Sequence, residues 1–167
     1  LKLFQTLTKK DRREIKKIVA SPYFNTREDV QILYDLIDTH LDSAGTKIIL
    51  SKEWLFTEIY KGKKFDAQKI NQAASLLTDI IKRYFRISEV ESNPNQGNVF
   101  LLKALRYRKA DKHFDREYNN CIEELEKSKI KNAQFYITKY NVLFEDYQNK
   151  SQQERDTSKL NLQNLSD

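Results

Sequence analysis

Residues 50–91, LSKEWLFTEIYKGKKFDAQKINQAASLLTDIIKRYFRISEVE, decide the fold class of this chain. Ser51 and Asp66 are suitable N-caps, because a side-chain oxygen can accept from an amide of the first helical turn. Gly62 suits the end of a helix. The stretch therefore predicts a short helix over 52–60, a basic turn and a long helix over 66–86. The long helix must bury its apolar face, which consists of Ile70, Ala73, Ala74, Leu77, Ile80, Ile81, Tyr84 and Phe85.

The whole chain has the composition of an all-α protein. Its 167 residues include 3 glycines and 2 prolines, which leaves little of the punctuation that a sheet-rich fold needs. Apolar residues at helical spacing predict further helices over 3–20, 26–42, 100–127 and 132–149. The core faces expected for the last two are Phe100, Ala104, Tyr107, Phe114, Tyr118, Cys121 and Leu125, then Ala133, Ile137, Tyr140, Leu143, Phe144 and Tyr147.

These helices predict two domains. Residues 1–92 are expected to form an N-terminal helical bundle. Residues 98–167 are expected to form a long antiparallel helical hairpin of the repeat type, because helices joined by a short connection fold back on one another.

Residues 85–102 allow two interpretations. Residues 85–90 alternate weakly, as a strand does, and Asn93-Pro94-Asn95-Gln96-Gly97 is the strongest turn signal in the chain. If residues 99–102 paired back, they would form a wing, and residues 51–102 would resemble a winged-helix unit. Otherwise the segment is a loop between helical layers. Residues 47–50 are predicted to be a short extended segment.

The net charge of +6 and the pI near 9.2 permit nucleic-acid binding without requiring it. Lysines and arginines near the basic turn and in the second half could neutralise phosphates. However, the long helix offers few side chains for base edges beyond Gln68, Asn71 and Gln72. The second hypothesis is therefore that residues 51–102 form a helix-turn-helix or winged unit that binds nucleic acid, with these candidate residues: Lys61, Lys63, Lys64, Lys69, Arg106, Arg108 and Lys109.

The sequence contains no phosphate loop, zinc motif or metalloprotease motif. His40 and His113 are isolated, Cys121 lies on an apolar face as a buried, inert thiol would, and the acidic face of residues 35–42 is expected to be solvated. We therefore predict a non-catalytic protein without cofactor or metal. One cysteine fits a reducing compartment and no apolar run is long enough to span a membrane, which predicts a cytoplasmic protein.

Four passages resemble one known family: SPYFN at 21–25, IYKGKKFDAQKI at 59–70, LLKALRYRKADKHF at 101–114 and NLQNLSD at 161–167. They are similar to the N-terminal part of an uncharacterised helical family associated with Bacteroidetes, whose members continue into tetratricopeptide-like helix pairs. The resemblance implies a longer helical array and no known activity. The chain begins at Leu1 and lacks methionine, so we expect it to be a piece of a longer protein. Because helical arrays present broad surfaces to other polypeptides, the first hypothesis is an interaction scaffold with an unidentified protein partner.

Overall fold

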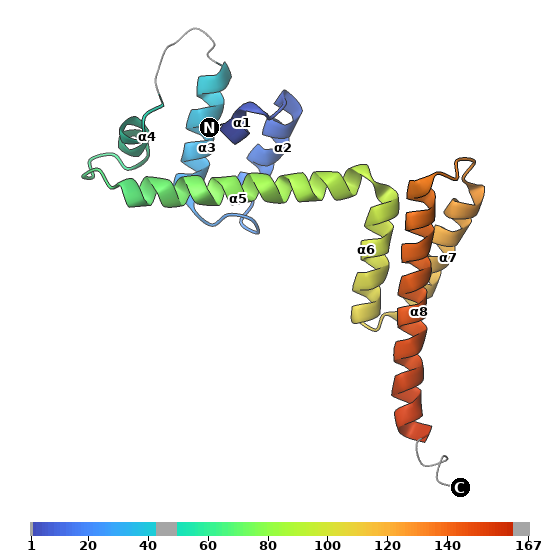
Figure 1. The fold of residues 1–167 in the computed structure, drawn as a ribbon. Coiled ribbons are helices and arrows are strands. Elements are labelled where there is room, and N and C mark those ends of the chain that lie inside the picture. The colour runs from blue at the N-terminus through green and yellow to red at the C-terminus, as the bar shows by residue number, and fades with distance from the viewer. Residues whose placement is uncertain (1, 43–49, 162–167) are drawn as a thin grey trace. The chain divides into compact units, whose positions relative to one another are not determined.

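The computed structural model describes residues 2–42 and 50–161, and every regular element in them is an α-helix, as predicted (Figure 1). The predicted extended segment at 47–50 and the passage at 161–167 lie almost entirely outside these residues. Of the helices described, none has both the length and the hydrophobicity to cross a bilayer. The helices are α1 Lys2–Gln5, α2 Lys9–Ala20, α3 Glu28–Asp42, α4 Lys52–Ile59, α5 Ala67–Ser92, α6 Pro94–Tyr107, α7 Asp111–Lys127 and α8 Ala133–Asn161.

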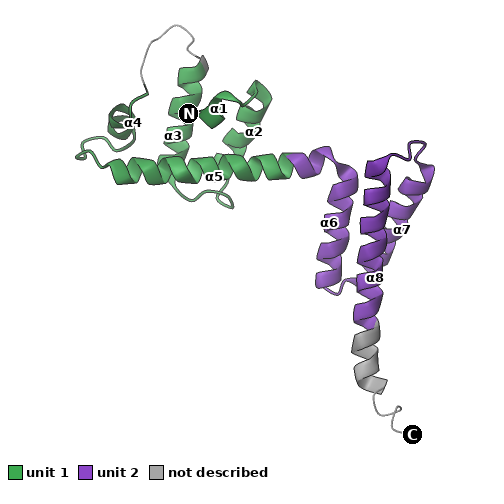
Figure 2. Ribbon diagram, viewed as in Figure 1, with its two compact units in different colours: residues 1–88 green, residues 89–167 purple. Residues whose placement is uncertain are grey.

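The chain divides into two compact units, Leu1–Ser88 and Glu89–Asp167 (Figure 2). In unit 1, α2, α4 and α5 begin at side-chain caps. The Thr8 hydroxyl accepts from the Asp11 amide at 3.1 Å while the Asp11 carboxylate accepts from the Thr8 amide at 2.9 Å, which is a capping box. Ser51 and Asp66 each accept from a first-turn amide, as the sequence predicts. The helix predicted over 3–20 is interrupted by this cap and becomes α1 and α2.

The core of unit 1 lies where α5 runs across α2 and α3 (Figure 1). The apolar face of α5 is buried as predicted, except that Ala74 and Phe85 are exposed. The buried side chains come from all five helices of the unit. They are Phe4, Ile15, Val19, Val30, Leu33, Tyr34, Ile37, Leu55, Phe56, Ile70, Ala73, Leu77, Ile80, Ile81 and Tyr84.

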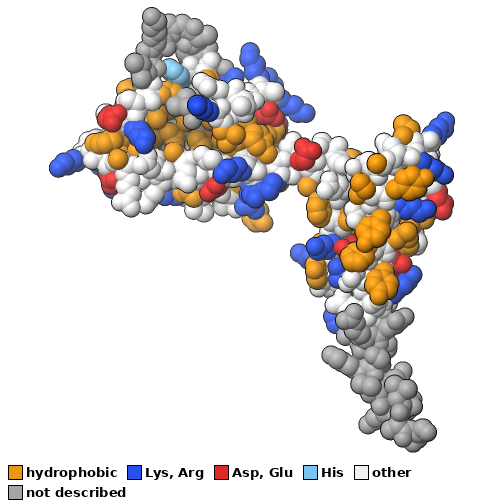
Figure 3. Space-filling view, viewed as in Figure 1, with side chains coloured by type: hydrophobic (Ala, Val, Ile, Leu, Met, Phe, Trp, Pro, Cys, Tyr) orange, Lys and Arg blue, Asp and Glu red, His pale blue; other side chains and the backbone are white. Residues whose placement is uncertain are grey.

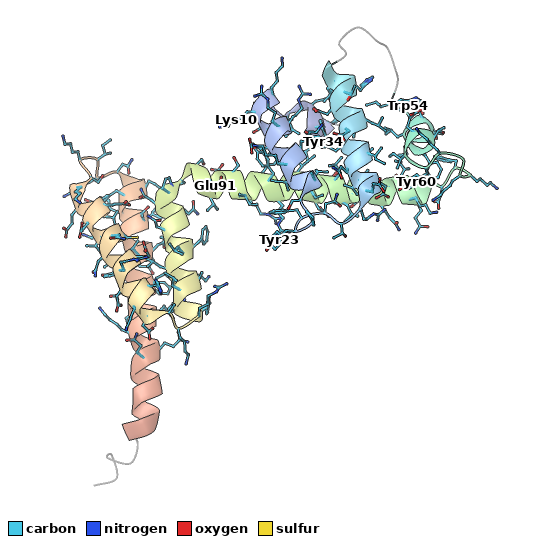
Figure 4. The ribbon with its side chains drawn as sticks, turned by 180° about the vertical axis from the view of Figure 1, so that it is seen from behind. Lys10, Tyr23, Tyr34, Trp54, Tyr60 and Glu91 are labelled. Carbon is cyan, nitrogen blue, oxygen red and sulfur yellow. The ribbon has the colours of Figure 1, made fainter. Side chains whose placement is uncertain are left out.

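Tyrosine hydroxyls connect the helices of unit 1. Tyr34, labelled in Figure 4, donates from α3 to the Arg12 carbonyl of α2. Tyr84 donates from α5 to the Asp11 carboxylate at 2.6 Å. Tyr60, after α4, donates to Asp29 of α3, and its burial together with this bond raises the pKa of Tyr60 to about 12.

The sequence suggested that the acidic face of α3 is solvated, but part of this face pairs with α2. Asp35 pairs with Lys16 at 2.9 Å and Asp38 pairs with Arg12 at 2.7 Å, so two of its carboxylates face the basic side of α2. The Arg12–Asp38 pair is the less exposed of the two. This face therefore contributes to the α2–α3 contact.

In unit 2, α6 contacts both α7 and α8, and α7 contacts α8. The core consists of Leu102, Phe114, Cys121, Leu125 and Val142. Cys121 is a buried free thiol, as predicted, and burial raises its pKa.

Both interpretations of residues 85–102, the wing and the loop between helical layers, are wrong, because all of these residues except Asn93 belong to α5 or α6. The turn signal there is a helix start: Asn93 accepts from the Gln96 amide at 3.3 Å, and Pro94 occupies the first helical position, where its missing amide costs nothing. One α-helix ends at Ser92 and the next begins at Pro94, so no strand pairing is possible.

The single helix predicted over 100–127 is also wrong. It divides at Lys109, which adopts a left-handed φ of 52°, and the Ala110 amide returns to the Leu105 carbonyl at 3.1 Å. This closure ends α6 and allows α7 to fold back. The described part of 98–167 therefore forms three helices where the sequence predicts a hairpin of two.

Candidate protein-binding surface

The main departure from the sequence prediction is in α8, where the face expected to be core is exposed. Tyr140 and Tyr147 are 65% and 64% exposed. Figure 3 shows hydrophobic side chains gathered over α8. We call this face the α8 stripe and define it as Tyr136, Ile137, Tyr140, Leu143, Phe144 and Tyr147.

The opposite face of α8 is buried although much of it is polar. It consists of Thr138, Val142, Glu145 and Asn149. Arg106 of α6 donates from Nε to Glu145 Oε2 at 2.8 Å, and both residues are buried. Removing either partner would leave a buried charge unpaired, which is strongly unfavourable. This ion pair therefore joins the inward face of α8 to α6, and the α8 stripe faces outward.

The α8 stripe has the spacing of a helix-packing seam. Tyr136, Tyr140, Leu143 and Tyr147 alternate steps of four and three residues, as the core positions of a coiled coil do. At 100° per residue, Ile137 and Phe144 lie on one flank of this seam, and Lys139 and Asp146 lie on the other. The rings of Tyr140 and Phe144 stack with centroids 5.9 Å apart. Asp146 accepts from Lys150 at 2.7 Å.

Helix α6 carries a second group of exposed apolar residues. Phe100, which the sequence assigns to the core, is 48% exposed, and Tyr107 is also exposed. Leu102 and Arg106 take the inward positions instead. The Lys103 ammonium and the Arg106 guanidinium lie over the Tyr107 ring, at 6.0 and 4.6 Å from its centroid.

The residues predicted to bind nucleic acid fall into both units. Lys61, Lys63, Lys64 and Lys69 are exposed in the α4–α5 connection and the first turn of α5, and no ion pair within residues 2–42 and 50–153 involves them. Arg108 and Lys109 are exposed between α6 and α7. The assignment of Arg106 to a nucleic-acid surface is wrong, because its guanidinium is buried against Glu145.

Unit 1 contains a cavity of about 280 Å³ between α1, α3, α4 and α5. Apolar side chains form most of its lining, with Lys52, Asn71 and Thr78 as the polar members. Among the described residues that line it, Lys52 alone is ionisable, so the cavity holds no pair of groups for acid–base or nucleophilic catalysis. Nor do the described side chains bring three or more His, Cys, Asp or Glu together as metal ligands.

Comparison with protein-family models, with curated proteins and with solved structures finds no match to this chain. The function of the α8 stripe therefore has to be inferred from its own geometry and chemistry.

Proposed function

We propose that this chain is a non-catalytic interaction protein that binds a protein partner through the α8 stripe. One observation carries the proposal: six large apolar side chains are exposed side by side on α8. Scattered exposed apolar residues are ordinary, but a continuous patch of this kind marks a contact surface. The proposal agrees with the scaffold expected from the sequence, and the single buried thiol supports a reducing, cytoplasmic location.

The residue types of the α8 stripe are those of a protein interface. Four of its six residues are Tyr or Phe, and aromatic residues are enriched at protein interfaces. Tyrosine combines a large apolar ring with a hydroxyl that tolerates water, so it suits a surface that is exposed before binding. Because interface energy concentrates near the centre, we expect Tyr140 and Phe144 to contribute most, about 2 kcal/mol or more each on truncation.

The test is a double variant, Tyr140→Ser with Phe144→Ser, compared with a matched control on α7, Glu123→Ser with Lys127→Ser. Both pairs are exposed, so neither change should alter the unfolding midpoint by much. Partners captured from extract would be purified, and their Kd measured by isothermal titration calorimetry. We expect the stripe variant to weaken binding by about 100-fold or more and the control to leave it unchanged. Equal binding by the wild type and the stripe variant would refute the proposal.

Nucleic-acid binding by unit 1 is a second candidate function. Its support is that Lys61, Lys63, Lys64 and Lys69 are exposed without ion-pair partners among the described residues, and that Phe65 beside them is 44% exposed. Exposed cations next to an aromatic ring suit a single strand, whose phosphates they neutralise while a base stacks.

This second candidate is tested by fluorescence anisotropy with labelled single-stranded DNA and RNA at about 50 and 200 mM salt. The variant Lys63→Glu with Lys64→Glu should weaken binding and reduce the slope of log K against log salt by about 1 for each phosphate that is no longer neutralised. Absence of binding at the lower salt concentration would exclude it.

A further inference from the structure

We propose that the partner seated on the α8 stripe is a second copy of this chain, bound antiparallel through its own α8 stripe. This inference rests on the proposed function of the stripe and identifies its partner. It is carried by the symmetry of the stripe, by the charges on one flank and by the area that the stripe can bury.

The spacing of the seam residues of the α8 stripe, in steps of four, three and four, is the same in both chain directions. In an antiparallel pair of helices, each residue meets the residue that lies equally far beyond the twofold axis. With that axis level with the peptide bond between residues 141 and 142, Tyr136 meets Tyr147 of the second copy and Tyr140 meets its Leu143. The two pairings use all four seam residues, and each joins two apolar side chains.

The two flanks of the seam are also matched. Antiparallel helices bring the same flank of each copy together, so Ile137 faces Phe144 of the second copy on one side. On the other side Lys139 faces Asp146, and the twofold axis repeats both contacts. A parallel pair would instead bring opposite flanks together, so Lys139 would face the apolar flank with Phe144 and would lack the Asp146 carboxylate of the second copy.

Asp146 can take part in this contact although it already accepts from Lys150. A carboxylate has about four lone-pair sites and can accept from two ammonium groups. Lys139 is exposed, and among the described residues no ion pair engages it. The contact therefore gives this exposed ammonium a counter-charge, and it uses an anion whose side chain is partly buried.

The area of the stripe is sufficient for a specific dimer. Its six side chains are 43–65% exposed. A large apolar side chain offers about 150–250 Å², so about 100 Å² of each remains to be buried. Twelve such side chains in a dimer give about 1,200 Å², which is the lower end of the range for stable interfaces. We therefore expect reversible association with a Kd in the micromolar range.

The experiment is sedimentation equilibrium of the whole chain from nanomolar to high micromolar concentration. Lys139→Glu alone and Asp146→Lys alone each create two like-charge contacts, and each should weaken the dimer about tenfold. An equimolar mixture of K139E and D146K chains should regain wild-type affinity, because every contact between the two chains then joins opposite charges. The variant Tyr140→Ser with Phe144→Ser should be monomeric.

The outcomes separate this inference from the proposed function. If the wild-type chain is monomeric at every concentration, the inference that the partner is a second copy is refuted. The proposed function then stands if the stripe variant loses its binding to a different protein. A dimer whose K139E and D146K chains fail to complement each other overturns the antiparallel pairing. A dimer unaffected by the Tyr140 and Phe144 changes overturns the use of the α8 stripe. Complementation in the mixture supports the inference, because no effect within one chain can produce it.

Discussion

Replacing Glu145 with alanine tests the feature that orients α8. In the wild type the Arg106 guanidinium and the Glu145 carboxylate are joined at 2.8 Å, and each side chain is 9% exposed. Glu145→Ala leaves the guanidinium in the same surroundings without its counter-charge. The variant Arg106→Met with Glu145→Leu removes both charges and keeps the volume nearly unchanged.

The expected magnitudes follow from two opposing terms. The attraction between the two charges is about 6 kcal/mol at an effective dielectric constant of about 20. Desolvation of the two ions costs several kcal/mol each, so the pair as a whole contributes little net stability. Removing one partner abolishes the attraction, but the desolvation cost of the remaining ion persists. The loss should destabilise unit 2 by about 3–5 kcal/mol. The double replacement should be nearly neutral or stabilising.

Urea unfolding followed by far-ultraviolet circular dichroism measures these differences. With an m-value of about 2 kcal/mol per M, Glu145→Ala should lower the midpoint of unit 2 by about 2 M. Fluorescence of Trp54, the only tryptophan, follows unit 1 in the same samples. Glu123→Ala on α7 is the matched control, because its pair with Lys127 is exposed at 3.4 Å and is worth about 0.5 kcal/mol.

Two results would refute this reasoning. If Glu145→Ala and Glu123→Ala shift the midpoint equally, the buried pair does not hold α8 in its orientation. If the double replacement is as unstable as Glu145→Ala, the loss comes from packing around residue 145 and not from an unpaired charge.

Three further predictions concern titration, backbone conformation and thiol access. Because burial and the bond to Asp29 raise the pKa of Tyr60 from 10.0 to about 12, the unfolded phenol ionises first. The contribution of Tyr60 to the free energy of unfolding should therefore be complete below pH 10 and should be lost as the pH rises to about 12. Tyr60→Phe should reduce this loss when urea midpoints are read from Trp54 fluorescence. Gly62→Ala should destabilise by about 1 kcal/mol, because φ is +75° although nothing crowds the added Cβ, whereas Gly97→Ala inside α6 should stabilise by up to about 1 kcal/mol in the same thermal-unfolding assay. Cys121 should react with a chromogenic disulfide only as fast as unit 2 opens, and moderate urea should accelerate it, because the thiol is buried and its pKa is raised; rapid reaction of the native chain would contradict this.

The start of several helices could be predicted from sequence because a cap is local. Ser51 and Asp66 each accept from an amide only two or three residues ahead, and the residue types needed are specific. The burial of α5 could also be predicted, since its apolar face is too long to remain exposed. The end of α6 could not, because the left-handed position is held by Lys109 and not by the glycine that usually marks it.

The orientation of α8 was beyond sequence reasoning for a different reason. Helical spacing reveals an apolar face, but it does not reveal what covers that face. The inward face of α8 includes Glu145, which pairs with Arg106, a residue 39 positions earlier, and both are charged types that a sequence pattern assigns to the surface. Sequence alone does not reveal this long-range pairing, and for that reason the sequence pattern places Arg106 on a nucleic-acid surface.

The border between the two units, after Ser88, lies inside α5, which continues to Ser92. Proteases bind their substrates as extended chain, and a helix offers none until it unwinds. Digestion therefore cannot release the two units at their border unless turns of α5 melt first. For the same reason, an expression clone that stops at Ser88 would sever a helix, and one that ends at Asn93 would retain the natural close of α5.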